Sequence, residues 1–305
     1  MHKVSILHLI TTAKNASPFD VNMAYDAGFD KIMPYTNVLQ DEVVALTQDA
    51  MFSRGTSTKQ GPSGVQREAL FFGARDIHVA LDMQNAAVLS MFTPFEMSTM
   101  ADPSGAFTTA AAMMAKIDAH LTLNNQTFAQ QTIAIFGASG TVGSTAALIA
   151  ASLNANVQLV AHKNVAQMQA YADTIHEKYD VTLQVVDGTN DSAKSKVLNT
   201  ASIAICAAVA GVRVLETAHF AQSQTLKIIA DVNAVAPSGA AGLPVMSDGG
   251  LIEGTQISGF GALTIGQLKY KTQQKLLQHL LAADHPIHVD FNDAFEVARD
   301  LLAHA

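Results

Sequence analysis

The sequence has a single cysteine, Cys206, and no long apolar run. One cysteine excludes an intrachain disulfide, and its place in a predicted buried strand indicates a small core residue. No stretch is long and apolar enough to cross a bilayer. Residues 1–10 lack the apolar core and the small-residue cleavage site of a signal peptide, so we expect a first strand there and a cytoplasmic protein.

Positive charge is also scarce. Lys and Arg number 18 against 26 Asp and Glu, which gives a formal net charge of -8. A net negative protein is a poor partner for nucleic acid and for an anionic membrane surface. With 49% hydrophobic residues, the 305-residue chain is able to form the cores of two domains.

Several catalytic motifs are missing. No tyrosine is followed four residues later by a lysine, which excludes the tyrosine–lysine proton relay of short-chain dehydrogenases. There is no glycine–lysine phosphate loop, no H-E-x-x-H and no cysteine cluster, and the 11 histidines lack metal-ligand spacing. We therefore expect no metal site.

A glycine triplet lies in the middle of the chain. A β-branched run ending at Phe136 leads into Gly137, Gly140 and Gly143, spaced G-x-x-G-x-x-G, and then into an apolar helix. Glycines at this spacing let the backbone approach a pyrophosphate, whose charge meets the N–H groups and the dipole of the helix start. The strand, turn and helix together predict a dinucleotide cradle. We expect the cofactor to contact the residues of this turn: Gly137, Ser139, Gly140, Thr141, Val142 and Gly143.

Strands and helices alternate from residue 131 onward, which predicts a parallel sheet covered on both faces. We expect an α/β protein with a smaller α/β substrate domain over 1–125 and a Rossmann-type NAD(P)-binding domain over 126–266. C-terminal helices over 267–305 are expected to join the substrate domain and pack back across the cleft. The polar segment 121–130 is the expected linker, and 53–65 an exposed loop. The predicted strands are 4–9, 31–34, 131–136, 157–161, 181–186, 203–207, 227–232 and 257–260. The predicted helices are 20–28, 41–49, 107–121, 141–153, 168–179, 192–199, 268–281 and 292–304.

The residues after the second Rossmann strand, His162 and Lys163, bear on the choice of cofactor. An Asp or Glu there would bind the ribose 2′-hydroxyl and exclude a 2′-phosphate. No acid is present, and His162 with Lys163 offers positive charge to a phosphate. This favours NADP, or use of both NADP and NAD, over strict use of NAD. A solvated loop lysine is the alternative interpretation.

Three polar clusters flank the Rossmann-type domain in the sequence. Asp20 lies at the start of a predicted helix, where an N-cap is the simpler interpretation. The turn 101–109 carries more polar groups than a cap needs, although capping is the simpler interpretation here too. Lys269 follows the last Rossmann strand, beside which the interdomain cleft should open, although lysines there are usually solvated.

These pieces resemble the NAD(P)-dependent methylene-tetrahydromethanopterin dehydrogenases of methylotrophic bacteria. The match is closer to the branch that accepts both NAD and NADP than to the strictly NADP-dependent branch, which has a glycine–arginine pair in place of His162 and Lys163. The matching motifs follow the family's order and span nearly the whole chain: SPFDVNMAYDAGFD, PYTNV, LTQD, FSRG, ADPSGAFTTAAAM, IFGASGTVG, VDGT, DVNAVAP, GALTIGQLKYKTQ and DFNDAFEVA.

The resemblance implies that a hydride passes from a methylene group bridging two pterin nitrogens to the nicotinamide, in one-carbon (formaldehyde) oxidation. It also implies that Asp20 and Lys269 are catalytic. Loss of the hydride leaves an N–CH=N cation and needs no proton transfer, so the site requires proximity, stacking and a negative potential. We expect Asp20 to supply that potential or to hold the amino edge of the pterin. Lys269 would hold a pterin carbonyl or fix the carboxylate.

Further residues complete the expected site. Arg54, with the basic loop through Lys59 and Arg67, is expected to meet the anionic tail of the pterin. The other expected substrate contacts are Asp102, Ser104 and Thr108. The expected cofactor contacts beyond the glycine turn are His162, Lys163, Ala207, Ala208, Val209 and Asn233, the last near the nicotinamide carboxamide.

A homo-oligomer is expected. Two alternative functions stay open from the sequence. One alternative is a methylene-tetrahydrofolate dehydrogenase, although the lysine-based signature of folate dehydrogenase/cyclohydrolases is not evident in the front domain. The other is a non-catalytic NADP-sensing regulator. Its marker would be loss of Asp20 or Lys269, and both are present.

Overall fold

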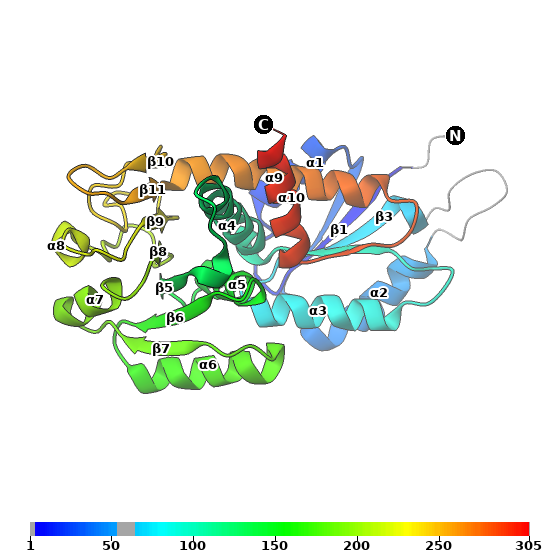
Figure 1. The fold of residues 1–305 in the computed structure, drawn as a ribbon. Coiled ribbons are helices and arrows are strands. Elements are labelled where there is room, and N and C mark those ends of the chain that lie inside the picture. Colours follow the sequence, from blue (N-terminus) through cyan, green and yellow to red (C-terminus); the bar gives the residue numbers. More distant parts are fainter. Residues whose placement is uncertain (1–3, 54–64, 305) are drawn as a thin grey trace. The chain divides into compact units, whose positions relative to one another are not determined.

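The computed structural model describes residues 4–53 and 65–304 (Figure 1). The chain divides into two compact units. The first comprises Met1–Thr108 and Tyr270–Val297, and the second Thr109–Lys269 and Ala298–Ala305.

The strands described in the first unit form a five-stranded parallel sheet in the order β12-β4-β3-β1-β2. These strands are β1 (Ile6–Ile10), β2 (Lys31–Tyr35), β3 (Glu68–Phe72), β4 (Ser98–Ala101) and β12 (His288–Val289). Every residue of β3 and β4 is buried, as expected for parallel strands covered on both faces. Figure 1 shows α1 (Pro18–Ala27) on one side of this sheet, and α2 (Val43–Phe52) and α3 (Ile77–Ser90) on the other.

The second unit is built on a seven-stranded sheet in the order β10-β11-β9-β8-β5-β6-β7 among the residues described. All neighbours are parallel except β10 and β11. The strands are β5 (Thr132–Phe136), β6 (Asn156–Ala161), β7 (Gln184–Asp187), β8 (Ile203–Cys206), β9 (Ile228–Asp231), β10 (Asp248–Leu251) and β11 (Ser258–Phe260). The helices within this unit are α5 (Thr141–Ser152), α6 (Val165–Tyr179), α7 (Asp191–Leu198) and α8 (Thr217–Phe220).

Three helices contribute residues to both units. They are α4 (Ala106–Leu123), α9 (Ala262–Ala282) and α10 (Phe291–Ala303). The division of the chain falls inside α4, between Thr108 and Thr109, and inside α9, between Lys269 and Tyr270. Continuous helices thus carry the chain from one unit to the other.

The predicted α/β class with a parallel sheet is confirmed, and so is the burial of Cys206 in a strand, where it is 1% exposed. The sequence patterns did not predict β3, α3, β4, α8, β10 or β12. β3 is a short run of apolar residues after Glu68, which periodicity alone does not separate from a buried helix segment. β12 has two residues, too few for any pattern. The strand predicted over 181–186 begins later, at Gln184, and the helix predicted over 41–49 is α2, preceded by a 3-10 turn at Gln40–Glu42.

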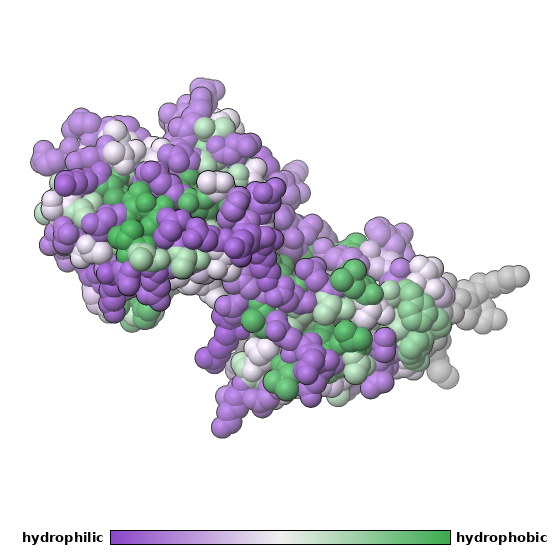
Figure 2. Space-filling view, turned by 90° about the horizontal axis from the view of Figure 1, so that it is seen from below, coloured by the Kyte–Doolittle hydropathy of each residue, from purple (hydrophilic) through white to green (hydrophobic). Residues whose placement is uncertain are grey.

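No helix in the described part of the chain is long and apolar enough to span a membrane. On the face shown in Figure 2, hydrophobic side chains (green) form patches among hydrophilic ones (purple). The exposed apolar side chains include Phe52, 54% exposed, and Phe92, 49% exposed, whose ring centroids lie 5.8 Å apart.

Candidate active site

The glycine turn follows the central strand of the second unit. Gly137 has φ +81, in the left-handed region, and a Cβ there would lie 2.5 Å from the carbonyl oxygen of Ala207. A Cβ on Gly143 would lie 2.4 Å from the carbonyl oxygen of Gly137. Both positions therefore require glycine, the first for its backbone conformation and both for the close approach of neighbouring backbone.

The start of α5 is the part of this turn that fits a pyrophosphate. Its N-cap is Gly140, which has no side chain to accept hydrogen bonds from the first N–H groups. In contrast, Asn164 caps α6 by accepting from Gln167 N at 3.1 Å, and Asn190 caps α7 by accepting from Ala193 N at 2.9 Å. The uncapped N–H groups and the helix dipole offer an anion site where the glycine motif predicts it.

An acidic residue at the end of β7 lies beside the end of β6, which leads into the residues predicted to meet the 2′-phosphate of NADP. His162 and Lys163 directly follow β6 and are exposed, as expected. In the sheet, Ala161 pairs with Asp187, the last residue of β7. The backbone N–H of Thr189 donates to this carboxylate at 2.8 Å and lowers the pKa of Asp187 below its usual value. This negative charge was not predicted, because it comes from the neighbouring strand and not from the residues that follow β6.

The loops after β8 and β9 hold the remaining predicted cofactor residues. Ala207 N donates to Phe136 O at 2.8 Å, which fixes the loop after β8 against the end of β5. Ala208 follows it, and Val209 is 77% exposed. Asn233 is 5% exposed and its Oδ1 accepts from Gly211 N at 3.1 Å. The residues predicted to contact the cofactor on β5, β8 and β9 therefore meet at the carboxyl edge of one sheet, where ligands of such sheets bind.

Asp20 in the first unit is buried, with 4% exposure. Ser17, not Asp20, caps α1, because the Ser17 hydroxyl accepts from Asp20 N at 3.2 Å. The Asp20 carboxylate instead accepts from Gln273 Nε2 at 2.7 Å, a contact between residues 253 positions apart. A buried carboxylate held by an amide is a group that folding alone would not favour, and such groups concentrate at functional sites.

Lys269 lies on α9, at the end of the segment Thr109–Lys269 of the second unit, and is partly buried. Gln273, the partner of Asp20, lies four residues later on the same helix and is 0% exposed. Residues four apart lie on one side of a helix. This spacing from Lys269 is the one sign in the sequence of a role for Gln273, which was not among the predicted site residues.

The turn predicted to bind substrate divides into a buried scaffold and one exposed residue. The Asp102 carboxylate accepts from Phe107 N at 2.9 Å and from the Thr108 hydroxyl at 2.6 Å, and both Asp102 and Thr108 are 0% exposed. These contacts anchor the first turn of α4, as the capping interpretation predicts. Ser104 is exposed and has φ +54, unusual for a residue other than glycine. Ser104 is therefore the member of the three that a ligand can reach.

Arg54 and Lys59 lie outside the described residues. Arg67 ends a 3-10 turn at Val65–Arg67, directly before β3.

A pocket of about 930 Å³ in the first unit was not foreseen. It is lined by residues of β1, β2 and α2, among them His8 and Tyr35. His8 Nε2 lies 2.9 Å from Glu68 Oε2, and His8 Nδ1 lies 3.2 Å from the Tyr35 hydroxyl. Burial, with the charge of Glu68, raises the pKa of Tyr35. His8 and Glu68 were not among the predicted residues; the signal that could have marked them is a single polar residue in an otherwise apolar strand.

Comparison with known proteins gives the same family as the motifs. A family model described as methylene-tetrahydromethanopterin dehydrogenase, N-terminal, matches residues 18–104. An NAD(P)-dependent methylenetetrahydromethanopterin dehydrogenase of Methylorubrum extorquens is 38% identical over 299 residues, covering 97% of this chain and 98% of that protein. The chain belongs to the methylene-tetrahydromethanopterin dehydrogenase family.

A second relative is more distant. The bifunctional protein MdtA of Methylorubrum extorquens is 27% identical over 310 residues, covering 97% of this chain and 98% of that protein. Among solved structures, an ornithine transcarbamoylase from Giardia lamblia has a TM-score of 0.54 at 10% identity, covering 92% of this chain and 86% of that one. At that identity the likeness concerns the fold alone. Membership of the methylene-tetrahydromethanopterin dehydrogenase family rests on the sequence relatives.

Proposed function

We propose that this chain is an NAD(P)-dependent methylene-tetrahydromethanopterin dehydrogenase that transfers a hydride from the methylene carbon of the pterin to the nicotinamide. The observation that carries the proposal is the 38% identity to the Methylorubrum extorquens enzyme along 97% of the chain. The glycine turn with its uncapped helix supports use of a dinucleotide.

The second unit supplies the cofactor side of this proposal. When bound, NAD(P)+ supplies the hydride acceptor. The N–H groups at the start of α5 would hold its pyrophosphate, and His162 and Lys163 would meet the adenosine ribose or its 2′-phosphate. Because the adenosine end belongs at β6, the nicotinamide end belongs on the other side of β5, at the loops after β8 and β9. Ala207, Ala208, Val209 and Asn233 lie in those loops.

Asp20 would act on the pterin through its charge. Removal of the hydride leaves positive charge shared by two nitrogens, and a buried carboxylate interacts with it more strongly than an exposed one. The 2.7 Å bond from Gln273 would hold the carboxylate in place. Lys269 would orient the pterin or the Asp20 carboxylate, and Ser104 would contact the substrate from the turn that Asp102 and Thr108 anchor. No step requires the protein to move a proton.

An anaerobic assay with methylene-tetrahydromethanopterin tests the proposal. NADP+ and NAD+ are supplied separately, methylene-tetrahydrofolate serves as the parallel substrate, and methenyl product and reduced nicotinamide are followed together. We expect the two products in equal amounts from the methanopterin substrate. Absence of turnover in protein that binds NADPH would contradict the proposal and favour a regulator, whereas turnover only with the folate substrate would change the carrier.

We further propose a homo-oligomer in the cytoplasm. The cytoplasmic part is supported by the single, buried cysteine, since secreted proteins more often carry disulfides. The half-exposed rings of Phe52 and Phe92 support an oligomer, because contiguous apolar surface is typical of subunit contacts. Light scattering after size-exclusion chromatography tests the oligomer, and a monomer at micromolar concentration would contradict it.

A further inference from the structure

Two buried polar side chains, Asp231 and Asn233, lie where β9 ends, at the carboxyl edge of the second unit's sheet. Asp231 is 2% exposed and Asn233 is 5% exposed. Buried carboxylates and amides are costly unless their hydrogen bonds are satisfied. The partners of these two side chains therefore show what the pair holds in place.

The Asp231 carboxylate is surrounded by the backbone of the loop that follows it. Oδ1 accepts from Asn233 N at 2.9 Å and Oδ2 accepts from Ala240 N at 3.1 Å. A Cβ on Gly239 would lie 2.8 Å from Asp231 Oδ1, so the loop closes on the carboxylate at a residue without a side chain. Burial raises the pKa of Asp231, while the N–H groups of Asn233, Ala240 and Gly239 act in the opposite direction. The carboxylate thus joins the two ends of loop 233–240.

The Asn233 side chain joins this loop to a second one. Its Oδ1 accepts from Gly211 N at 3.1 Å, in the loop after β8, and from Val235 N at 3.0 Å, in its own loop. Its Nδ2 donates to Pro237 O at 2.8 Å. One side chain therefore makes three hydrogen bonds to the backbone of two loops. Both loops begin at neighbouring strands, β8 and β9.

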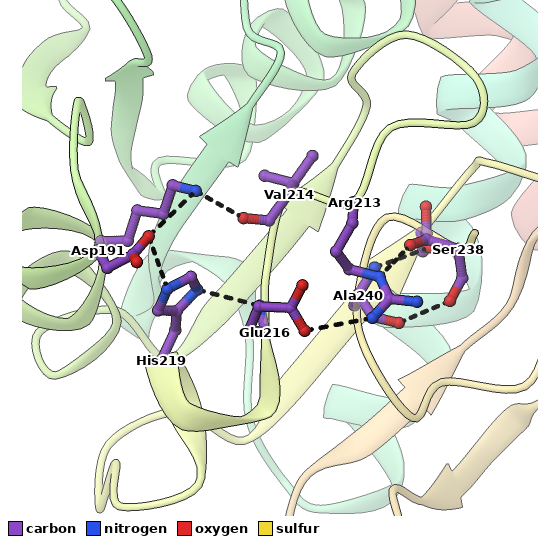
Figure 3. A network of polar contacts seen from close by, with 9 residues as sticks. Asp191, Arg213, Val214, Glu216, His219, Ser238 and Ala240 are labelled. Atoms are coloured by element: carbon purple, nitrogen blue, oxygen red, sulfur yellow. Dashed lines mark hydrogen bonds and ion pairs between the residues drawn. The ribbon is translucent and has the colours of Figure 1, made fainter. Parts of the chain in front are cut away.

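The loop after β8 is braced on its other side as well (Figure 3). Arg213 Nε donates to Ser238 O at 2.6 Å, a second link between the two loops. Further along, Lys194 Nζ donates to Val214 O at 2.9 Å and ties the loop to α7. His219 Nε2 lies 3.1 Å from Asp191 Oδ1, which connects α8 to the start of α7. These contacts hold the outer part of the loop, whereas Asn233 holds its inner part near Gly211.

We infer that Asn233 and Asp231 are positioning residues, which together fix the loops after β8 and β9 in the shape that receives the nicotinamide half of the cofactor. This rests on the proposed use of NAD(P). It changes the expected role of Asn233: its carbonyl oxygen already accepts two backbone hydrogen bonds, so its main effect on the carboxamide passes through the loops. Hydride transfer depends on exact placement of the ring, and loops fixed before binding reduce the entropy lost on ordering it.

The test compares two ligands that share the adenosine half. NADH carries the nicotinamide, whereas ADP-ribose lacks it. Asn233→Ala is expected to weaken NADH binding about tenfold, the effect of losing about 1.4 kcal/mol. The Kd of ADP-ribose should stay within about twofold, because a change near the nicotinamide site has little effect on a separate part of the nucleotide site. Fluorescence of bound NADH and calorimetry with ADP-ribose measure the two constants.

Ser202→Ala is the matched control. The Ser202 hydroxyl accepts from Thr132 N at 3.1 Å and donates to Thr132 O at 3.2 Å, at the opposite, amino edge of the same sheet. Loss of the hydroxyl lowers stability but affects neither loop. NADH and ADP-ribose should therefore bind the Ser202→Ala variant as they bind the unaltered protein. Urea unfolding of both variants gives the loss of stability for comparison.

Two results would overturn the inference. Equal weakening of NADH and ADP-ribose in Asn233→Ala would mean that the residue supports the whole unit, and unchanged binding of both would mean that the loops keep their shape without it. The experiment needs no pterin. A failure of the pterin assay therefore leaves it intact, and NADH binding by the unaltered protein tests the nucleotide site separately.

Discussion

The glycine turn of the second unit and the Asp20 site of the first unit are specified in opposite ways. The turn lies within the seven residues from Gly137 to Gly143 and depends on missing side chains, since a Cβ on either terminal glycine would collide with backbone at about 2.4–2.5 Å. Asp20 depends on a side chain 253 positions away. A site built from the backbone of one segment can be predicted from a local sequence motif. The environment of a buried charge can be predicted only when the fold that brings its partner to it is known.

The largest expected effect is on the Asp20 side of this comparison. Asp20→Asn keeps the shape and the oxygen that accepts from Gln273 but removes the charge. If the carboxylate stabilises the cation left by the hydride, kcat should fall about a hundredfold, the usual effect of losing one preorganised electrostatic group. Steady-state rates with methylene-tetrahydromethanopterin measure this.

Asp26→Asn on the same helix serves as the control for Asp20→Asn. Asp26 is exposed and accepts from the Tyr270 hydroxyl at 3.2 Å. Its change should leave kcat nearly unaltered. Near-normal turnover in Asp20→Asn would remove Asp20 from the catalytic role, and an equal fall in both variants would point to damage to α1.

The glycine turn should respond to a single added methyl group. In Gly143→Ala the new carbon would lie 2.4 Å from Gly137 O, so the turn must shift. Overpacking of this kind costs about 1–3 kcal/mol, and we expect NADH affinity to fall roughly tenfold to a hundredfold. Equilibrium titration with NADH gives the Kd.

Gly250→Ala separates a local clash from any loss of glycine. The nearest atom to a Cβ on Gly250 is Ser247 Oγ at 3.7 Å, an ordinary contact. Its NADH affinity should therefore match that of the unaltered protein. If Gly143→Ala also bound NADH normally, the close approach at the turn would not matter for the cofactor.

The sequence predicted the glycine turn of the second unit better than it predicted the contacts that depend on tertiary structure, and the reason is physical. The spacing from Gly137 to Gly143 reports a backbone requirement that holds wherever a strand meets a helix over a phosphate. The pairing of Asp187 with Ala161 and of Asn233 with Gly211 follows instead from strand register and loop folding. Asp102 is a different case, since its carboxylate accepts hydrogen bonds within its own turn and its contact with substrate stays a prediction. Local patterns identify the cradle, and only tertiary contacts identify what shapes it.

Within the second unit, Lys163 is predicted to affect the choice between NADP and NAD, in contrast to the glycine turn, which would bind the part that both cofactors share. Lys163 is exposed, so its attraction for a 2′-phosphate acts through solvent. Exposed pairs contribute up to about 1 kcal/mol. Lys163→Ala should therefore raise the KM for NADP+ roughly fivefold and leave that for NAD+ unchanged.

Lys227→Ala is the control for charge alone. Lys227 precedes β9 at the amino edge of the sheet, where its Nζ donates to Gln224 O at 2.9 Å. The Lys227→Ala substitution should change neither the KM for NADP+ nor the KM for NAD+. If Lys163→Ala raised both constants equally, the lysine would act on the part common to NAD and NADP, and the 2′-phosphate assignment would be wrong.

The smallest expected effect concerns Cys206, which ends β8 directly before the loop at Ala207 but belongs to the core. It is 1% exposed, and burial raises the pKa of its thiol well above the usual value. Because the thiolate is the reactive form, a thiol reagent at neutral pH should modify the folded protein far more slowly than the urea-unfolded chain, with NADH binding unchanged over that time. Rapid labelling of the folded protein, or protection that appears only with NADH, would mean that the end of β8 opens to solvent. The carboxyl edge of this sheet would then be shaped by the cofactor as well as by Asp231 and Asn233.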